Sequence, residues 1–180
     1  DPFDDACVGH VLDALKKGRY RDDTVVVLWG NHGYDVGEKK IPKSALWEQT
    51  TCTPLITYTL SKLPSGTPAS GKLCKSPVSL VDLYPTVINL GGLPENVHLD
   101  GPSFAPRVKD PNTHWPYPAV ITHSPHWYGP CHAARSRDFH HIHYSDGGEE
   151  LYDLEPDPLQ RNNLANDPAH AQTRAELQEW

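Results

Sequence analysis

The fold is decided by residues 24–34, which read Thr-Val-Val-Val-Leu-Trp-Gly-Asn-His-Gly-Tyr. A continuous run of β-branched and aliphatic residues is typical of a strand that is buried on both faces, as in a parallel sheet. Asn31 and His32 follow the run directly, and in open α/β sheets ligands bind beyond the carboxyl ends of the strands. The stretch therefore predicts an α/β fold with a candidate site in this loop.

Further elements are predicted on either side of this strand. Apolar residues at helical spacing predict an amphipathic helix over residues 4–17 and another helix over residues 78–91, which stops at two glycines. Residues 44–52 can form a short helix, and residues 54–60 resemble a second buried strand. A short strand is expected around Leu73, within a loop rich in Pro, Gly and Ser.

The last third of the sequence has a different character. Residues 94–118 are rich in proline and are expected to be irregular, and residues 167–180 are expected to end in a helix. Short antiparallel strands, with a hairpin turn at Asp146-Gly147, are predicted in the region between them. These strands cover residues 120–122, 133–143 and 150–152.

Composition narrows the possible classes of protein. The chain has 180 residues, a net charge of -7, 18 Pro, 4 Cys and no Met. The acidic balance argues against a nucleic-acid-binding protein, which needs a basic face. No segment approaches the ~20 apolar residues of a membrane span, and four Cys are too few for a disulfide scaffold of this length. The start at Asp1 and the absence of Met favour a piece of a longer polypeptide over a small complete domain.

Three polar residues near the first strand are candidates for chemistry. Asn31 offers a carbonyl oxygen, which suits Ca²⁺, and His32 offers an imidazole, which suits a transition metal or a hydrogen bond to an anion. Lys43 could neutralise a bound anion or protonate a leaving oxygen. The alternatives are a plain turn for Asn31 and His32, and a solvated side chain for Lys43.

Histidines gather in the second half of the chain, and His132 is the candidate site residue among them. Their spacing matches no standard zinc motif, so a His-rich metal-binding module is only an alternative. Asp82 is expected to be a hydrogen-bonding residue at the start of a helix. The histidines are His114, His123, His126, His132, His140, His141 and His143.

Several strings, in this order, resemble the sulfatase family of the alkaline-phosphatase superfamily, and most of all its iduronate-2-sulfatase-like branch. They cover nearly the whole chain and lie at residues 30–38, Lys43 with 45–56, 81–86, 99–103, 148–154, 157–158 and 163–165. The resemblance implies that residues 1–118 are a C-terminal part of the α/β core, a mixed sheet flanked by helices. It implies that residues 119–180 are a small antiparallel C-terminal subdomain with a terminal helix.

The resemblance also implies a reaction. Members of the family hydrolyse sulfate esters with a formylglycine, made from a Cys or Ser near the N-terminus, and with Ca²⁺. Carried over to this sequence, Asn31 and His32 are metal ligands or their neighbours, and Lys43 and His132 are catalytic. The implied partners are a sulfated small molecule or glycan and the rest of the sulfatase domain, with no nucleic acid and no membrane. The implied location is periplasmic, secreted or lysosomal.

Several departures from the family pattern keep other functions open. The nucleophile motif and its Asp pair are absent, so this chain alone is expected to be inactive. Asn31 stands where an Asp ligand is usual, and the loop between Lys40 and Lys43 is one residue short. The alternatives are a phosphonate or phosphodiester hydrolase of the same superfamily and a non-catalytic protein that binds sulfated glycans. If strands outside this chain complete the sheet, its uncovered face should be apolar.

Overall fold

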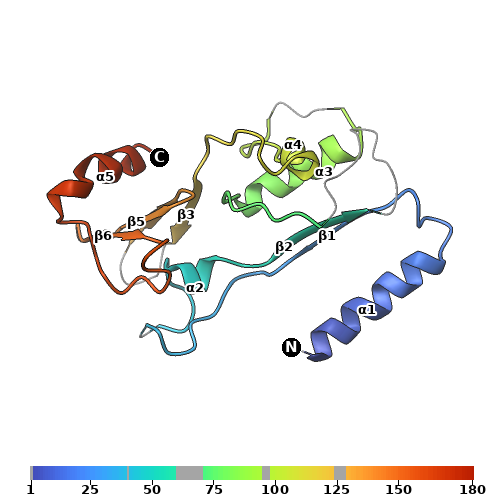
Figure 1. The fold of residues 1–180 in the computed structure, drawn as a ribbon, viewed down its shortest axis with the longest axis horizontal. Helices are drawn as coiled ribbons and strands as arrows, with labels where there is room; N and C mark the ends of the chain where they lie inside the picture. Colours follow the sequence, from blue (N-terminus) through green and yellow to red (C-terminus); the bar gives the residue numbers. More distant parts are fainter. Residues whose placement is uncertain (1, 40, 60–70, 95–97, 124–128) are drawn as a thin grey trace.

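The computed structural model describes residues 2–39, 41–59, 71–94, 98–123 and 129–180 (Figure 1). Much of the predicted loop around Leu73 and the whole of His126 lie outside these ranges. The helices are α1 (Pro2–Lys17), α2 (Glu48–Thr51), α3 (Leu83–Leu90), α4 (Ala105–Lys109) and α5 (Ala171–Gln178), with 3-10 turns η1 (Leu80–Asp82) and η2 (Pro168–His170). The strands are β1 (Val25–Trp29), β2 (Leu55–Thr59), β3 (Ala119–His123), β4 (Cys131–Arg135), β5 (Phe139–His143) and β6 (Glu149–Asp153).

The strand at the start of the site loop is confirmed, but its expected environment is not. β1 pairs with β2 in an antiparallel ribbon in which Val25 lies opposite Thr59 and Trp29 opposite Leu55. The connecting chain leaves β1 and enters β2 at the same end of the ribbon, which forces the antiparallel direction. Within the described residues no third strand joins this pair, so Trp29 stays 49% exposed instead of being buried.

One face of this ribbon is apolar and exposed. Side chains on paired residues share a face, so Leu28 and its partner Ile56 lie together, next to Val26 and its partner Tyr58. Leu28, Ile56 and Tyr58 are all exposed. This is the apolar face that the sequence leads us to expect if strands from outside this chain complete the sheet.

Helices α3 and α4 lie against each other near the ribbon (Figure 1). Leu90 of α3 and Ala105 of α4 are fully buried and pack with Val25 of β1. The helix predicted over residues 78–91 is confirmed as η1 followed by α3, but Val81 and Val87, two of its apolar residues at helical spacing, are exposed. The strand expected around Leu73 is wrong, because that residue is 80% exposed and in no strand.

The C-terminal strands form one antiparallel sheet in the order β3-β4-β5-β6. The single strand expected over residues 133–143 is two strands, because the Ser136 N–H donates to the Phe139 carbonyl at 2.9 Å and closes a tight turn. The turn at Asp146-Gly147 is confirmed. Gly147 has a φ of +85°, and the Tyr144 N–H donates to the Gly148 carbonyl at 2.9 Å.

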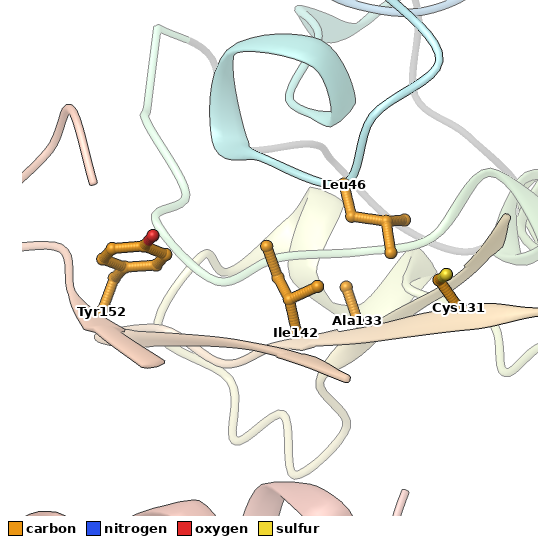
Figure 2. Packing of buried hydrophobic residues seen from close by; sticks show 5 residues of the cluster. All are labelled: Leu46, Cys131, Ala133, Ile142 and Tyr152. Atoms are coloured by element: carbon orange, nitrogen blue, oxygen red, sulfur yellow. The ribbon is translucent and has the colours of Figure 1, made fainter. Parts of the chain in front are cut away.

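The two faces of this sheet bury different partners. On one face, Leu46 from the segment before α2 packs on Cys131, Ala133, Ile142 and Tyr152 (Figure 2). On the other face, Leu177 of α5 packs with Ala134, Leu151 and Ala165. The segment that follows the site loop and the terminal helix therefore cover opposite sides of one sheet.

Two further observations bear on the expectations. Among the described residues, no helix combines the length and the apolar character that crossing a membrane requires. Asp82 is a structural residue, as expected: its carboxylate accepts the Ser79 N–H at 2.8 Å and completes a capping box at the start of η1.

Candidate functional site

The loop after β1 is held in place by its backbone. The Gly30 N–H donates to the Pro54 carbonyl at 3.0 Å and extends the ribbon by one step, and the Gly33 N–H donates to the Thr50 carbonyl of α2 at 2.9 Å. A Cβ on Gly33 would lie 2.1 Å from the Gln49 carbonyl oxygen. Only glycine fits there, so the loop and α2 are in direct backbone contact.

Asn31 and His32 are exposed between these two glycines. The His32 Nδ1 lies 2.7 Å from the Gly33 carbonyl oxygen. Because a carbonyl only accepts hydrogen bonds, Nδ1 carries the proton and the lone pair of the neutral ring is on Nε2. That nitrogen can bind a metal or take up a proton, while Asn31 presents an uncharged amide.

The rest of the loop folds around the buried side chain of Asp35. Its carboxylate accepts the N–H of Gly37 at 2.8 Å and that of Lys39 at 2.7 Å, and its own N–H donates to the Pro42 carbonyl at 2.8 Å. These bonds hold the Asp35 carboxylate inside the loop and close the loop just before Lys43, which is exposed.

A buried polar cluster anchors α2 to the C-terminal sheet. The Glu48 carboxylate accepts Nη2 of Arg135 at 3.0 Å and Nε at 3.2 Å, and both side chains are 18% exposed. The Glu48 N–H donates to Oε1 of Gln160 at 2.7 Å, and Nε2 of the same amide lies 2.8 Å from Nδ1 of His140. Gln160 and His140 are fully buried.

The protonation state of His140 follows from these contacts. Because Oε1 of Gln160 accepts a backbone N–H, its amide nitrogen must donate to His140, whose Nδ1 is then unprotonated. Burial lowers the pKa of His140 to about 4, against the opposing pull of the Glu48 charge 3.7 Å away. His140 is therefore a neutral structural residue and not a site histidine.

An aromatic cluster beside it holds the end of the loop. The Lys39 ammonium lies 5.2 Å from the ring centre of Trp47 and 5.0 Å from that of Tyr152. Glu150 accepts both the Trp47 indole N–H at 2.8 Å and the Tyr152 hydroxyl at 2.7 Å. Burial, and then the hydrogen bond to Glu150, raise the pKa of Tyr152 well above its ordinary range.

The structure does not bring His132 to the other candidates. His132 is exposed on β4 opposite His143, and its side chain lines a shallow groove with Gln178 and Trp180 at the α5 face of the sheet. The segment of Leu46 and α2, which contacts Gly33, packs on the opposite face. Asn31, His32 and Lys43 share one loop, and His132 lies away from it.

The loop supplies only part of a calcium site. Ca²⁺ takes about six to eight oxygen ligands, whereas the exposed loop tip offers the Asn31 amide oxygen and an imidazole, and the Asp35 carboxylate is buried inside the loop. Across the described ranges, no three His, Cys, Asp or Glu side chains are grouped so that they could hold a metal. The described residues therefore do not fit Ca²⁺ by themselves.

Sequence reasoning missed the residues that position the loop. Glu48 falls within a string that resembles the family, which could have drawn attention to it. Arg135 and Gln160 meet it across 87 and 112 residues of sequence, so no local pattern reveals either contact.

The sequence is similar to a known protein family and to named proteins. The family model described as "Sulfatase" matches residues 4–93, which contain β1, the site loop, α2 and β2. A protein named "Sulfatase" from Formosa agariphila is 37% identical over 166 residues, covering 91% of this chain and 31% of its own length. A Delta 4,5-hexuronate-2-O-sulfatase from Bacteroides thetaiotaomicron is 29% identical, covering 94% of this chain and 36% of its own length. The chain thus spans about a third of the length of these relatives.

Solved structures agree on the fold. The phosphonate monoester hydrolase from Silicibacter pomeroyi superposes with a TM-score of 0.79 at 23% identity, covering 97% of this chain and 37% of that structure. At this identity the likeness bears on the fold alone. It confirms the expected alkaline-phosphatase-like α/β fold.

Proposed function

The chain belongs to the sulfatase family, and we propose that it is the C-terminal portion of a sulfate-ester hydrolase of the iduronate-2-sulfatase-like branch. Residues 1–118 would be part of the catalytic core and residues 119–180 its C-terminal subdomain. The proposal rests mainly on the position of the loop that carries Asn31 and His32. This loop follows β1 inside the matched region, and the Gly33 N–H bonds it to α2. The proposed substrate is a sulfated saccharide, in keeping with the hexuronate 2-O-sulfatase among the relatives.

In this proposal the described residues bind and neutralise the sulfate group. Lys43 contacts the sulfate or protonates the leaving oxygen, since an exposed ammonium can do both. His32 offers the lone pair of Nε2 to the cation, whereas contact with the anion would require a proton on Nε2 that it could donate. Asn31 contributes one oxygen ligand at most, so the remaining ligands of a Ca²⁺ ion, and the formylglycine that would attack sulfur, must come from residues outside this chain. His132 remains a prediction from the resemblance, and no step is assigned to it.

A direct test uses the full-length polypeptide that carries this segment. Incubated with Ca²⁺ and a 2-O-sulfated unsaturated disaccharide, it should release sulfate, measured by ion chromatography. Lys43→Ala should lower kcat about 100-fold, while Lys109→Ala, which removes a charge from the end of α4, should leave it unchanged. Residues 1–180 alone should release none.

One alternative hydrolase remains open, because a phosphonate monoester hydrolase shares this fold. Phosphonate and phosphodiester substrates, which the resemblance to the superfamily left open, are therefore the second candidate class. Hydrolysis of a phosphonate monoester without sulfate release would overturn the sulfatase proposal in favour of this class. Tight binding of the sulfated disaccharide without any hydrolysis would indicate a non-catalytic relative.

A further inference from the structure

Gln160 joins both ends of the segment that carries Lys43 to the C-terminal part of the chain. The Lys39 ammonium, four residues before Lys43, donates to the Gln160 main-chain carbonyl, and the Glu48 N–H, five residues after it, donates to the Gln160 side chain. The segment between Lys39 and Glu48 is thus closed at both ends by a single fully buried residue.

The conformation of Gln160 is itself unusual. Its φ of +54° is in the left-handed region, which is uncommon for a residue with a side chain. The turn is held by Asp157, whose carbonyl accepts the Gln160 N–H at 3.1 Å and whose carboxylate accepts the N–H of Arg161 at 3.0 Å and of Asn162 at 2.8 Å. Such conformations persist only where the surroundings enforce them. Here the enforced turn aims both the carbonyl and the amide of Gln160 at the site segment.

The far end of the amide is fixed as well. Its nitrogen donates to Nδ1 of the buried His140 at 2.8 Å, so the side chain cannot rotate without leaving a buried polar group unpaired. The Glu48 N–H therefore donates to the Gln160 amide oxygen, and the orientation of this amide is fixed by its bond to His140 on β5. Because Gly33 is in backbone contact with α2, a shift of Glu48 would also move Asn31 and His32.

We propose that Gln160 is a positioning residue, which fixes the sulfate-binding loop from the C-terminal part of the chain without touching the substrate. It sets the place of Lys43 through Lys39 and Glu48, and the place of Asn31 and His32 through α2. The role of the loop in sulfate binding rests on the proposed function, whereas the mechanical coupling rests on the contacts above.

The variant that isolates the side chain is Gln160→Gly. Glycine adopts the left-handed φ without strain, so the turn and the carbonyl that receives Lys39 are kept, while both amide contacts are lost. Gln172→Ala, on the exposed side of α5, removes a glutamine that has no part in the loop and is the matched control.

Hydrogen exchange is the first measurement, and it does not depend on activity. In Gln160→Gly the amides of Gly33 and Lys39 should exchange at least about tenfold faster, while those of Tyr144 and Gly147 in the β5–β6 turn keep their rates. Unchanged exchange in the loop would overturn the proposal. Equal acceleration at all four amides would also overturn it, because it would show general destabilisation.

Kinetics is the second measurement. In the full-length enzyme, Gln160→Gly should lower kcat about tenfold with a smaller change in KM, because misplacing a catalytic group costs rate. Normal kcat together with a loosened loop would contradict a positioning role. A wild-type enzyme that releases no sulfate would contradict the proposed function, and the exchange data would still decide the coupling.

Discussion

Glu48 and Arg135 form a two-point ion pair, with nitrogen–oxygen distances of 3.0 and 3.2 Å, between residues that lie 87 positions apart in the sequence. Because both side chains are mostly buried, removing one partner leaves a charge with little solvent to replace it. Arg135→Met should lower the free energy of unfolding by about 3 kcal/mol, as measured by urea denaturation.

A double-mutant cycle checks that this loss belongs to the pair. Glu48→Gln combined with Arg135→Met should cost clearly less than the sum of the single changes. Lys16→Met, which breaks an exposed pair with Asp13 at 3.7 Å, should change stability by less than about 0.5 kcal/mol. Strict additivity of Glu48→Gln and Arg135→Met would show that the two side chains do not stabilise each other.

The buried His140 predicts an acid-sensitive fold. Its pKa is lowered from 6.5 to about 4, mainly by burial, with Glu48 acting in the opposite direction and Arg135 and His141 adding to the decrease. Between these two values the unfolded chain binds more protons than the folded one. The contribution of neutral His140 to the free energy of unfolding is therefore fully present above pH 6.5 and is lost as the pH decreases toward 4. The loss over this window should reach roughly 3 kcal/mol.

This dependence is measured by urea denaturation at a series of pH values. His140→Gln should flatten the slope between pH 4 and 6.5, whereas His10→Gln, at an exposed position of α1, should leave it intact. Burial also lowers the pKa of His141, so some slope should remain in His140→Gln. An unchanged slope in that variant would argue against a buried neutral His140.

Replacement of Gly33 by alanine should have the opposite effect on stability to the same replacement at Gly9. Gly33→Ala places a Cβ 2.1 Å from the Gln49 carbonyl and should destabilise the protein by about 2 kcal/mol as the loop is pushed off α2. Gly9→Ala, in α1, meets nothing within 4 Å and should stabilise it by about 0.5 kcal/mol. Thermal unfolding of both variants checks this, and equal melting temperatures would be evidence against the close contact of loop and helix.

We expect the charge of residue 31 to change the affinity of the proposed Ca²⁺ site. Asn31→Asp in the full-length protein adds a negative oxygen ligand and should tighten Ca²⁺ binding roughly tenfold by calorimetry. Asn112→Asp makes the same charge change in an exposed turn and should leave the affinity as it was. If Asn31→Asp and Asn112→Asp behaved alike, Asn31 would have no place at the cation.

Local patterns account for what the sequence could predict. The β-branched run at residues 24–29 predicted β1, and the Asp-Gly pair predicted the β5–β6 turn, since both signals lie within a few residues. The antiparallel pairing of β1 with β2 was missed, because it depends on the route of the chain from Gly30 to Pro54 and not on either strand.

In the candidate site, too, local features could be predicted from the sequence, whereas contacts between distant segments could not. Glycines on both sides of Asn31 and His32 marked a loop that can present side chains, and the structure has them exposed there. His132 was grouped with them by resemblance, but the alternation of side chains along β4 directs it to the α5 face. The contacts of Gln160 with Lys39 and Glu48 could not be predicted, because they join segments more than 100 residues apart and use a left-handed glutamine.

The contact of Lys39 with Gln160 also sets an order of events during synthesis. The two residues are separated by 121 positions, and ribosomes add about 5–20 residues per second. The β1–β2 ribbon can pair soon after it emerges, but the loop at its tip then waits on the order of 10 s before its anchor exists. Through this interval the nascent chain carries an undocked loop beside an apolar ribbon face, which makes this stage the one at which a chaperone would matter most.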